Sequence, residues 1–434
     1  MLFKTLGLTA LLSACAQATL QIVPGATWTA TNTGKHVQAH GAGIIKVGST
    51  FYMIGEDKTD GSAFQNINCY SSTNLVEWTY VGALLSRTAS GDLGPNRVVE
   101  RPKVIFNQST GKYVLYLHID SSDYGEAKVG VATGDSVCGK YNYLGSWRPL
   151  GFQSRDQGLF QDTDGKAYLL TEDRANGLRI NALTADYLNT TGTSSVYLWN
   201  RSIESPAILK QGGYYFMFGS LLTGWDPNDN VYSYATSLSG PWSAWQNFAP
   251  AGSKTFTSQT TYILPLSSTT AIYMGDRWVS TNLMRSTYVW LPLTISGTSV
   301  TMSDRVNWTP NVSAVLANGA VVISCTGCSG GSAAGYIGGS SGGSVTFSNV
   351  RADVTGRTTI RVKHLNGNTV QRFADVTVNG VTQRVAFLPT QDGNTPGSSV
   401  VHANLNAGIA NTIVVRITDG SYGPDVDRLM IPLS

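Results

Sequence analysis

Three acidic residues occupy the same position in three separate segments of the 434-residue chain, each at the start of an apolar strand. They are Glu100 in VVERPKVIF, Asp156 in SRDQGLFQD and Glu204 in SIESPAILK, and Gln259 in TSQTTYIL takes the equivalent position in a fourth segment. Carboxyl groups that flank one substrate can cleave a glycosidic bond, because one protonates the departing oxygen while a second group activates water. The proton donor needs a raised pKa, which burial and a neighbouring carboxylate provide. The pattern therefore indicates glycoside hydrolysis if these segments converge.

A repeated strand pattern predicts how the segments meet. Turns that are mostly led by glycine feed strands of apolar and aromatic residues at a spacing of roughly 50 to 60 residues, the range of propeller blades. The five copies begin at Gly48, Gly111, Gly165, Gly212 and Thr269. One such sheet cannot bury both of its faces, so we predict five sheets packed around an axis, a five-bladed β-propeller. The innermost strands would then bring Glu100, Asp156 and Glu204 to one pocket.

The first blade, like the fifth, offers no acid at this position. Its segment HVQAHGAGII supplies Gln38 and His40. A purely structural interpretation of the three acids is that they cap turns or pair with nearby arginines, namely Arg101, Arg155 and Arg201. Three acids at one phase of a repeat favour a shared site over three unrelated turn caps.

The composition changes after the last blade. From Ala317 onward Gly, Ser, Val and Thr dominate, and segments such as RTTIRVKHL and NTIVVRIT alternate between Gly/Asn turns. We therefore predict an all-β chain with a propeller over residues 19–305 and a β-sandwich of the jelly-roll type over residues 317–434. Residues 306–316 would form the linker.

Charge and targeting signals narrow the class of partner. Charged residues make up 13% of the chain and the formal net charge is +3, which argues against nucleic acid or an anionic membrane and favours neutral polar ligands. Residues 1–18 combine Lys4, an apolar run and Ala16-Gln17-Ala18, the three parts of a signal peptide. No later segment approaches the roughly 20 apolar residues that span a bilayer. We expect a secreted, extracellular monomer, in agreement with sequons at Asn107, Asn189, Asn200, Asn307 and Asn311.

Loss of the signal peptide leaves four cysteines, an even number that favours disulfides in an oxidising compartment. Cys325 and Cys328 in SCTGCSG are close enough for a small local loop, which leaves Cys69 and Cys138 to join two distant segments. A C-x-x-C pair can also bind zinc or do redox chemistry, but no second ligand pair or thioredoxin-like context follows it. Two structural disulfides are expected.

The predicted blades and the acids at these positions resemble glycoside hydrolase family 43. The stretches AHGAGII, ERPKVIFN, QDTDGKAYL and IESPAI are more similar to its exo-β-1,3-galactanase branch, which in fungi often carries a C-terminal carbohydrate-binding module of family 35. The resemblance covers essentially the whole mature chain. It implies release of galactose from the non-reducing end of β-1,3-galactan, the arabinogalactan backbone, with inversion and without a cofactor for the chemistry.

The resemblance also implies a role for each pocket residue. Glu204 matches the general acid of IESPAI, and Asp156 matches the residue that raises the pKa of this acid and orients it. Glu100 matches a branch-specific acid that could polarise water, bind a sugar hydroxyl or tune Glu204. The wider family has a general-base aspartate in blade one, where AHGAG has none. The candidate base is then Gln259, through its amide or an imidic-acid tautomer, with Glu100 as the alternative.

Further residues are expected to bind carbohydrate. Stacking on an indole buries the CH surface of a sugar while its hydroxyls reach polar groups. The candidates for the sugar subsite of the propeller are Glu56, Tyr124, Asn176, Trp225 and Trp278. The resemblance places those of the second domain at Tyr336, Asp392, Asn394, Tyr422 and Asp425. Asp427 matches a strand where many relatives hold a structural calcium ion, although VVISCTG replaces the expected Glu-Ala-Glu of the opening strand.

Two alternatives to the galactanase hypothesis stay open. Activity as an α-L-arabinofuranosidase or β-xylosidase is common elsewhere in family 43. A non-catalytic, carbohydrate-binding propeller would explain the missing aspartate of blade one. In every case the expected partner is a carbohydrate, and for the enzymes it is a polysaccharide substrate.

Overall fold

The computed structural model of the protein describes residues 21–199, 203–266, 270–308, 315–352 and 355–431. The predicted signal peptide lies outside these ranges, as do Asn200, Arg201, Asn311 and part of the predicted linker. The regular structure is almost entirely β-strand, which confirms the predicted all-β class. No helix in the described ranges is long and apolar enough to cross a membrane. The chain divides near residue 310 into two compact units.

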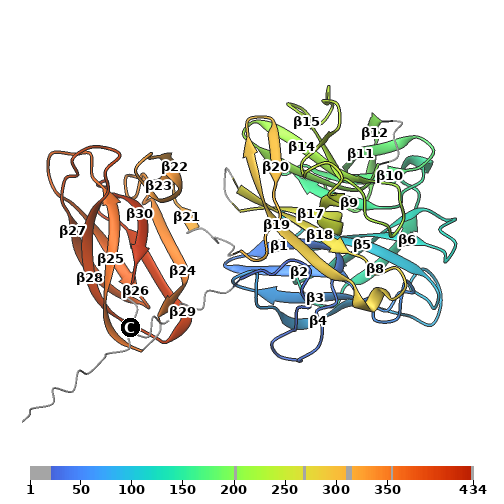
Figure 1. The fold of residues 1–434 in the computed structure, drawn as a ribbon, viewed down its shortest axis with the longest axis horizontal. Helices are drawn as coiled ribbons and strands as arrows, with labels where there is room; N and C mark the ends of the chain where they lie inside the picture. The colour runs from blue at the N-terminus through green and yellow to red at the C-terminus, as the bar shows by residue number, and fades with distance from the viewer. Residues whose placement is uncertain (1–20, 200–202, 267–269, 309–314, 353–354, 432–434) are drawn as a thin grey trace, which may run out of the picture. The chain divides into compact units, whose positions relative to one another are not determined.

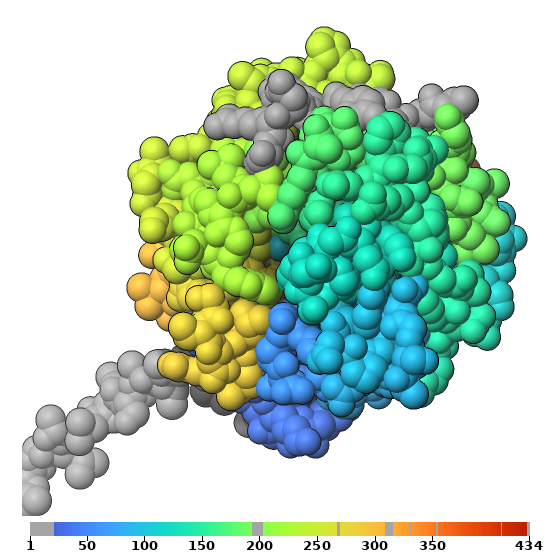
Figure 2. Space-filling model, turned by 90° about the vertical axis from the view of Figure 1, so that its right-hand side faces the viewer, coloured from blue at the N-terminus to red at the C-terminus, as the bar shows by residue number. Residues whose placement is uncertain are grey.

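Five four-stranded antiparallel sheets make up the first unit, and each sheet keeps its strands in sequence order (Figure 1). The sheets are β1 (His40–Val47), β2 (Thr50–Glu56), β3 (Asn66–Ser72) and β4 (Thr79–Ser86); β5 (Val98–Asn107), β6 (Lys112–Asp120), β7 (Lys128–Gly134) and β8 (Asn142–Trp147); β9 (Gln157–Gln161), β10 (Ala167–Asp173), β11 (Gly177–Leu183) and β12 (Thr190–Trp199); β13 (Ile203–Gln211), β14 (Tyr214–Leu221), β15 (Val231–Ala235) and β16 (Gln246–Asn247); and β17 (Gln259–Pro265), β18 (Thr270–Arg277), β19 (Thr287–Ser296) and β20 (Ser299–Met302). Short turns in the connections are η1 (Pro149–Gly151), α1 (Lys254–Thr257) and η2 (Leu283–Arg285). In Figure 2 the sheets follow one another around a central hollow, from blue through green to yellow. The predicted five-bladed propeller is the observed fold.

The hairpin of β13 and β14 shows why these sequences pair as strands. Gly212 and Gly213 both have positive φ angles, +59° and +84°, as a two-residue turn between right-twisted strands requires. The turn sets the pairing of Gln211 with Tyr214, and this register decides which residues of β14 point to each face.

Each face of β14 is buried against a different neighbouring blade. Phe216 and Phe218 pack into a cluster with residues of β17, β18 and β19, whereas Met217 packs into a second cluster with residues of β10 and β11. Complete burial of such a side chain stabilises a fold by about 1.5–3 kcal/mol. The blades therefore stabilise one another through both faces of each sheet.

The first strands of the five blades form a closed ring. Hydrogen bonds join four neighbouring pairs of strands: Lys103 Nζ to the Gly41 oxygen (2.6 Å), Gln157 Nε2 to the Arg101 oxygen (3.3 Å), Gln259 Nε2 to Glu204 Oε1 (2.7 Å), and Thr261 Oγ1 to the Ala42 oxygen (3.1 Å). Between β9 and β13, a Cβ atom on Gly158 would lie 2.3 Å from the Pro206 oxygen, so only glycine fits there. The inner strands thus converge on one axis.

The two ends of the propeller chain pair with each other. Ile22 and Trp308 exchange both backbone hydrogen bonds, at 2.8 and 3.0 Å. Trp308 also donates its indole N–H to the Trp290 oxygen and packs against the cluster between the fourth and fifth blades. These contacts tie the start of the described chain to the segment that follows β20.

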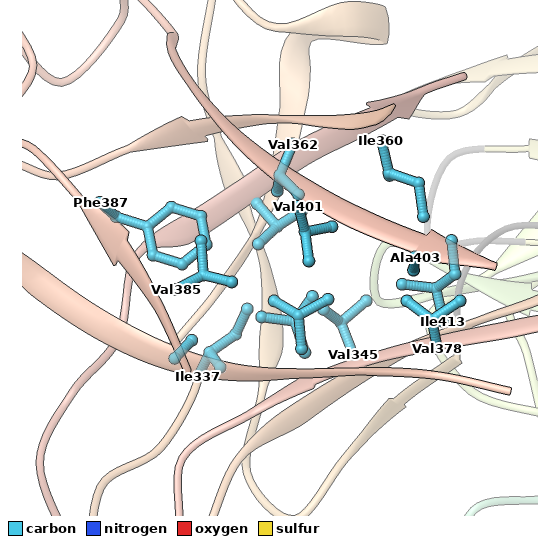
Figure 3. Close-up of a cluster of buried hydrophobic side chains, with 14 of the residues drawn as sticks. Ile337, Val345, Ile360, Val362, Val378, Val385, Phe387, Val401, Ala403 and Ile413 are labelled. Atoms are coloured by element: carbon cyan, nitrogen blue, oxygen red, sulfur yellow. The ribbon is translucent and has the colours of Figure 1, made fainter. Parts of the chain in front are cut away.

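Two five-stranded sheets form the second unit, with the strand orders β21-β24-β29-β26-β27 and β22-β23-β30-β25-β28. The strands are β21 (Val315–Ala317), β22 (Val321–Ser324), β23 (Ser332–Gly335), β24 (Ser344–Ala352), β25 (Gly356–Leu365), β26 (Arg372–Val378), β27 (Val381–Phe387), β28 (Gly397–Leu405), β29 (Gly408–Arg416) and β30 (Asp425–Met430), with the turn η3 (Ser329–Gly331). Apolar residues from both sheets, among them Val345, Val378, Ile360 and Val362, are buried together in one core (Figure 3). This unit is the predicted β-sandwich.

Both predicted disulfides are present. Cys69 of β3 pairs with Cys138, which follows β7, and Cys325 pairs with Cys328. The first bond links the first and second blades, and the second closes a local loop before β23. The chain is thus cross-linked once in each unit.

One predicted sequon is not available for glycosylation in the fold. Asn107 at the end of β5 is only 1% exposed, and its amide donates a hydrogen bond to the Ala185 oxygen. The sequence motif does not show this burial, so Asn107 gives no support to the expected secretion, and glycosylation of the other sequons stays a prediction. Asn189 and Asn307 are exposed.

Replacing Cys69 and Cys138 together by serine is expected to lower the free energy of unfolding by about 2–4 kcal/mol. The reason is that the disulfide bond restricts the conformations of the unfolded chain. Urea denaturation followed by intrinsic fluorescence measures the change. The matched control, Cys325→Ser with Cys328→Ser, opens a much shorter loop and should cost less. Equal stability of the Cys69/Cys138 variant and the wild type would contradict the expectation.

Candidate active site

A cavity of about 320 Å³ lies where the inner strands converge. Eight of the predicted site residues line it: Glu56, Glu100, Tyr124, Asp156, Glu204, Trp225, Gln259 and Trp278. Four residues that were not predicted to do so line it too: Arg101, Asp123, Arg174 and Gly224. Every blade contributes at least one polar side chain to this cavity.

Asn176 is a predicted sugar-binding residue that the structure places elsewhere. It lies in the exposed turn between β10 and β11 and does not line the cavity. Its amide donates a hydrogen bond to Asp173 Oδ2 at 2.7 Å, and its backbone N–H also bonds to Asp173. Asn176 therefore stabilises a turn, which is the usual role of asparagine in such a position.

Two β-bulges aim carboxyl groups at the cavity. Glu100 and Glu204 lie inside β5 and β13, not before them as predicted. Each is followed by a residue with a positive φ angle, +54° at Arg101 and +56° at Ser205, and then by a proline. The pairing register shifts just after each glutamate. Since proline lacks an N–H group for the ladder, the Glu-x-Pro sequence builds the same bulge twice.

Glu204 is buried in a setting that favours its neutral form. Burial raises the pKa of Glu204 to about 9, with further contributions from the negative charges of Asp156 and Glu172. Its Oε1 accepts a hydrogen bond from Gln259 Nε2 at 2.7 Å, and Ser220 Oγ lies 3.5 Å away. Glu204 is thus protonated at neutral pH and can donate a proton into the cavity.

Asp156 lies just before β9 and is paired with a cation beside Glu204. Its Oδ2 forms an ion pair with Arg101 Nη2 at 2.9 Å and accepts a hydrogen bond from Ser205 Oγ at 2.7 Å. The predicted pairing of an acid with Arg101 is therefore correct for Asp156. The ion pair and the position in the cavity occur together, because Arg101 is itself a residue of the cavity wall.

Lys58 joins two further acids of the cavity, Glu56 and Glu100. Its ammonium group lies 2.7 Å from Glu56 Oε2 and 3.0 Å from Glu100 Oε1. Burial alone would raise the pKa of Glu100, but Lys58 and His118 hold it well below its usual range. Burial raises the pKa of Glu56, against the attraction of Lys58. Tyr124 also donates its hydroxyl to Glu100 Oε1 at 3.2 Å. Glu100 is therefore an ionised, hydrogen-bonded carboxylate.

Blade one supplies its acid from the second strand. Gly41 in β1 has no side chain, and a Cβ atom there would lie 2.1 Å from Glu56 Oε1. The absence of this atom lets Glu56, the last residue of β2, reach the axis and accept the Arg101 N–H at 2.7 Å. His40 is turned away to pair with Asp276, Nδ1 to Oδ1 at 2.9 Å. Blade one thus carries a carboxyl at the cavity even though β1 has none.

Gln259 and two tryptophans form the wall contributed by the fourth and fifth blades. Trp278 Nε1 donates to Gln259 Oε1 at 2.8 Å, and Arg101 Nη2 donates to the same oxygen at 2.5 Å. The rings of Trp225 and Trp278 meet edge to face, with centroids 4.9 Å apart. Their faces supply the apolar surface on which a sugar ring can stack.

Glu100, His118 and Asp156 come close enough to hold a metal ion, with ligand atoms within 4.8 Å of one another. Their present partners argue against this use. Burial would lower the pKa of His118, but Asp120 and Glu100 raise it to about 9, so that the ring is cationic. The two carboxylates face the cations Lys58 and Arg101. The site is better described as a carboxylate pocket balanced by protein cations.

Comparison with known proteins identifies the family that has this arrangement. Residues 36–314 match the sequence profile described as Glycosyl hydrolases family 43. The chain belongs to family 43. A curated relative of this family 43 protein, xylan 1,3-β-xylosidase from Vibrio sp., is 24% identical over 191 residues, which are 40% of the chain. The chain covers 34% of the length of that relative.

Solved structures resemble the family 43 chain over more of its length. An exo-β-1,3-galactanase from Phanerochaete chrysosporium, whose structure was determined with β-1,3-galactotriose, is 40% identical with a TM-score of 0.65 and covers 95% of this chain and 100% of its own. A protein from Bifidobacterium bifidum described as a putative exo-β-1,3-galactanase is 38% identical with a TM-score of 0.63 and covers 65% of this chain and 97% of its own. Similarity to the first of these structures spans both units of the family 43 chain.

The predicted carbohydrate-binding residues of the second unit form two groups. Tyr336 and Tyr422 are 57% and 53% exposed and meet edge to face, with ring centroids 6.3 Å apart. Asp425 lies near them, and burial raises its pKa while the Tyr336 N–H opposes this shift. Asp392 instead accepts backbone N–H groups within its own loop, from Asn394 and Thr395, and Asn394 Oδ1 accepts the Thr326 N–H. The exposed tyrosine pair is the better candidate for contact with a sugar.

Asp427, the predicted calcium ligand, is already engaged by the chain. Its Oδ1 accepts the Ser329 N–H at 2.8 Å, and its Oδ2 pairs with Arg428 at 2.7 Å. A calcium ion in this unit therefore stays a prediction.

The cations Lys58 and Arg101 are two of the site residues that sequence reasoning did not assign to the site. Arg101 was considered only as a local ion-pair partner, together with Arg155 and Arg201, and Lys58, two positions after Glu56, was not considered. The available signal was that several acids at one buried axis require buried cations. Basic residues close to the predicted acids in sequence were therefore candidates, but the sequence did not show which of them are buried.

Glu204→Gln is expected to stabilise the protein increasingly as the pH rises. Because the pKa of Glu204 is about 9 in the folded state and 4.5 ordinarily, the folded protein binds a proton that the unfolded chain has lost between these values. The wild-type free energy of unfolding therefore falls with rising pH in this range. Glutamine does not titrate, so the free energy of unfolding of the variant should not fall in this way. Relative to the wild type, it should rise by about 2–4 kcal/mol between about pH 5 and pH 8.

Chemical denaturation at several pH values tests this gain. The exposed Glu77→Gln serves as a control and should show no such trend with pH. A constant stability difference between Glu204→Gln and the wild type would mean that Glu204 is ionised in the fold.

Proposed function

We propose that this protein is an exo-β-1,3-galactanase that releases galactose from β-1,3-galactan with inversion at the anomeric carbon. The proposal is carried by Glu204, a neutral acid in a cavity that all five blades build. The similarity at 40% identity to an exo-β-1,3-galactanase seen with β-1,3-galactotriose, over 95% of the chain, supports the choice of substrate.

The chemistry follows from the charges around Glu204. As the glycosidic bond breaks, Glu204 transfers its proton to the departing oxygen, so that the leaving sugar departs as a neutral alcohol. Asp156, paired with Arg101, keeps a negative charge beside the acid and so favours its protonated form in the resting enzyme. Water attacks from the opposite face of the sugar in an inverting reaction.

The remaining wall of the cavity suits a hexopyranose. The indoles of Trp225 and Trp278 offer apolar faces to the cavity, while Glu56, Glu100 and Tyr124 offer hydrogen-bonding groups to it. A galactose ring has an apolar CH surface and polar hydroxyls, so it can use both kinds of contact at once.

We extend the proposal to secretion, because an extracellular enzyme meets a wall polysaccharide directly. The N-terminal signal pattern, which ends at Ala16-Gln17-Ala18, supports this location. Two disulfides, Cys69–Cys138 and Cys325–Cys328, suit an oxidising compartment.

The function is tested by incubating the purified protein with β-1,3-galactan, xylan and arabinan and identifying the released sugars. We expect galactose from galactan, with kcat lowered about 10²–10⁴-fold in Glu204→Gln. The loss should be smaller on 2,4-dinitrophenyl β-galactoside, because a good leaving group needs no protonation. Glu126→Gln, at an ion pair with Arg97 outside the cavity lining, is the matched control and should keep wild-type activity.

Other products would contradict the proposal and indicate a different activity. Release of a pentose from xylan or arabinan would favour an arabinofuranosidase or β-xylosidase, as the Vibrio relative suggests. Binding of galactan without any product would make the propeller a lectin. Proton NMR of the first-formed anomer tests inversion separately.

The exposed tyrosines of the second unit are expected to bind the polymer without taking part in hydrolysis. Replacing Tyr336 and Tyr422 together by alanine should weaken binding to insoluble galactan about tenfold, because two stacking surfaces are lost. kcat/KM on a soluble galactobiose should not change. Val381→Ala, another exposed apolar side chain of this unit, is the control for pull-down measurements. Unchanged binding by the tyrosine variant would contradict this assignment.

A further inference from the structure

Lys58 is a buried cation that contacts three residues of the cavity wall without lining the cavity itself. Its side chain is 2% exposed, and its ammonium group lies 2.7 Å from Glu56 Oε2 and 3.0 Å from Glu100 Oε1. The same nitrogen lies 5.7 Å from the ring centroid of Trp225, within the range of a cation–π interaction. One lysine therefore joins residues of the first, second and fourth blades.

The backbone of Lys58 is fixed by Gln38, a polar residue of the first blade that does not line the cavity. The Lys58 N–H donates to Gln38 Oε1 at 3.1 Å. Gln38 is buried, its Nε2 donates to the Met284 oxygen at 3.2 Å, and its backbone N–H donates to the Tyr70 hydroxyl at 3.0 Å. The lysine is thus anchored at its backbone as well as at its ammonium group.

Lys58 is the cation that the two glutamates share. Among the described residues Glu56 forms an ion pair only with Lys58, whereas Glu100 also lies 3.6 Å from His118, which pairs with Asp120 at 2.9 Å. Burial raises the pKa of Glu56, Lys58 opposes this shift, and the charge of Glu100 adds to it. Without Lys58 one of the two buried carboxyls would have to take up a proton. The other titratable groups that face the pair are Arg101, Lys103, Tyr124 and Asp156.

Both glutamates keep capacity to accept hydrogen bonds from a sugar. An ionised carboxylate offers about four lone-pair sites. Glu56 uses one for the Arg101 N–H at 2.7 Å and one for Lys58. Glu100 accepts from Tyr124 at 3.2 Å and faces two cations, which leaves about one site. Since both residues line the cavity, the remaining sites can accept hydroxyl groups, and a proton on either carboxyl would occupy one of them.

We infer that Lys58 is a positioning residue of the sugar subsite, which holds Glu56 and Glu100 together as acceptors for the hydroxyls of one sugar and supports the Trp225 indole beside them. The inference rests on the proposed function, because it takes that sugar to be galactose. Lys58 acts through these three side chains and does not touch the substrate. It lets galactose bind without first removing a proton from the acid pair.

Lys58→Met tests this role, because methionine keeps an unbranched side chain and removes the charge. We expect the variant to bind galactose about tenfold more weakly at about pH 6.5 and to release up to about one proton more per bound galactose than the wild type. The proton that the acid pair takes up in the variant must leave before the pair can accept a hydroxyl. Its affinity should therefore rise with pH, by up to about tenfold per pH unit, while that of the wild type changes little.

Isothermal titration calorimetry with galactose measures both quantities. Titrations in phosphate and in ACES buffer, which differ in their heats of ionisation, give the number of protons released on binding. Chemical denaturation establishes that each variant is folded under these conditions. Lys112→Met is the matched control: it removes an exposed lysine that pairs with Asp135 outside the cavity lining, and it should bind galactose as the wild type does.

Lys58→Arg separates charge from packing and decides the question if Lys58→Met does not fold. Arginine keeps the positive charge but has a planar fork in place of the compact ammonium group. We expect weaker galactose binding than in the wild type and no additional proton, so release of an additional proton by this variant would overturn the inference.

Unchanged affinity and an unchanged proton count in folded Lys58→Met would also overturn it, because the lysine would then stabilise only the fold. A wild type that binds galactose but does not hydrolyse galactan would reject the proposed function alone. A wild type that does not bind galactose would overturn both.

Discussion

The shortage of positive charge at the propeller axis is the constraint on which the site depends. Glu56, Glu100 and Glu204 are buried at this axis and Asp156 is partly buried there, and the cations that pair with them are Lys58, Arg101 and His118. Burying an unpaired carboxylate is costly, so a carboxyl without a cation keeps its proton. In the described part of the chain Glu204 forms no ion pair, and its partners are the Gln259 amide and the Ser220 hydroxyl. The acid of the site is thus the carboxyl that these cations leave unpaired.

The same constraint explains the neutral residue of the fifth blade. A carboxylate in place of Gln259 would add another negative charge beside Glu204 and would compete with Asp156 for Arg101. The amide satisfies the Arg101 and Trp278 donors and still contacts Glu204. An amide in this position is therefore compatible with a buried, protonated acid in a way that a further carboxylate is not.

Local backbone irregularities place these groups. The bulges after Glu100 and Glu204 interrupt the regular alternation of their strands, and the missing side chain of Gly41 admits Glu56 from the second strand of its blade. Each of these features disturbs a sheet, and the packing between blades holds them in place. Closure of the five blades into a ring brings these local irregularities together at one cavity.

Much of the fold and of the candidate site could be predicted from the sequence alone. The Gly-led repeats, the Glu-x-Pro segments and the cysteine spacing reflect local physics, because turn geometry, strand alternation and short loops depend on neighbouring residues. They sufficed for the all-β class, the five blades, both disulfides and most residues that line the cavity. Only the tertiary structure showed that Asn176 stabilises a turn, that Asn107 is buried, that Glu56 replaces the missing acid of blade one, and that Lys58 and Arg101 divide the carboxyls between them. Those facts depend on which side chains from distant segments are buried next to one another. A short sequence pattern does not show which distant residues will be neighbours, how deeply they are buried or what charge they carry.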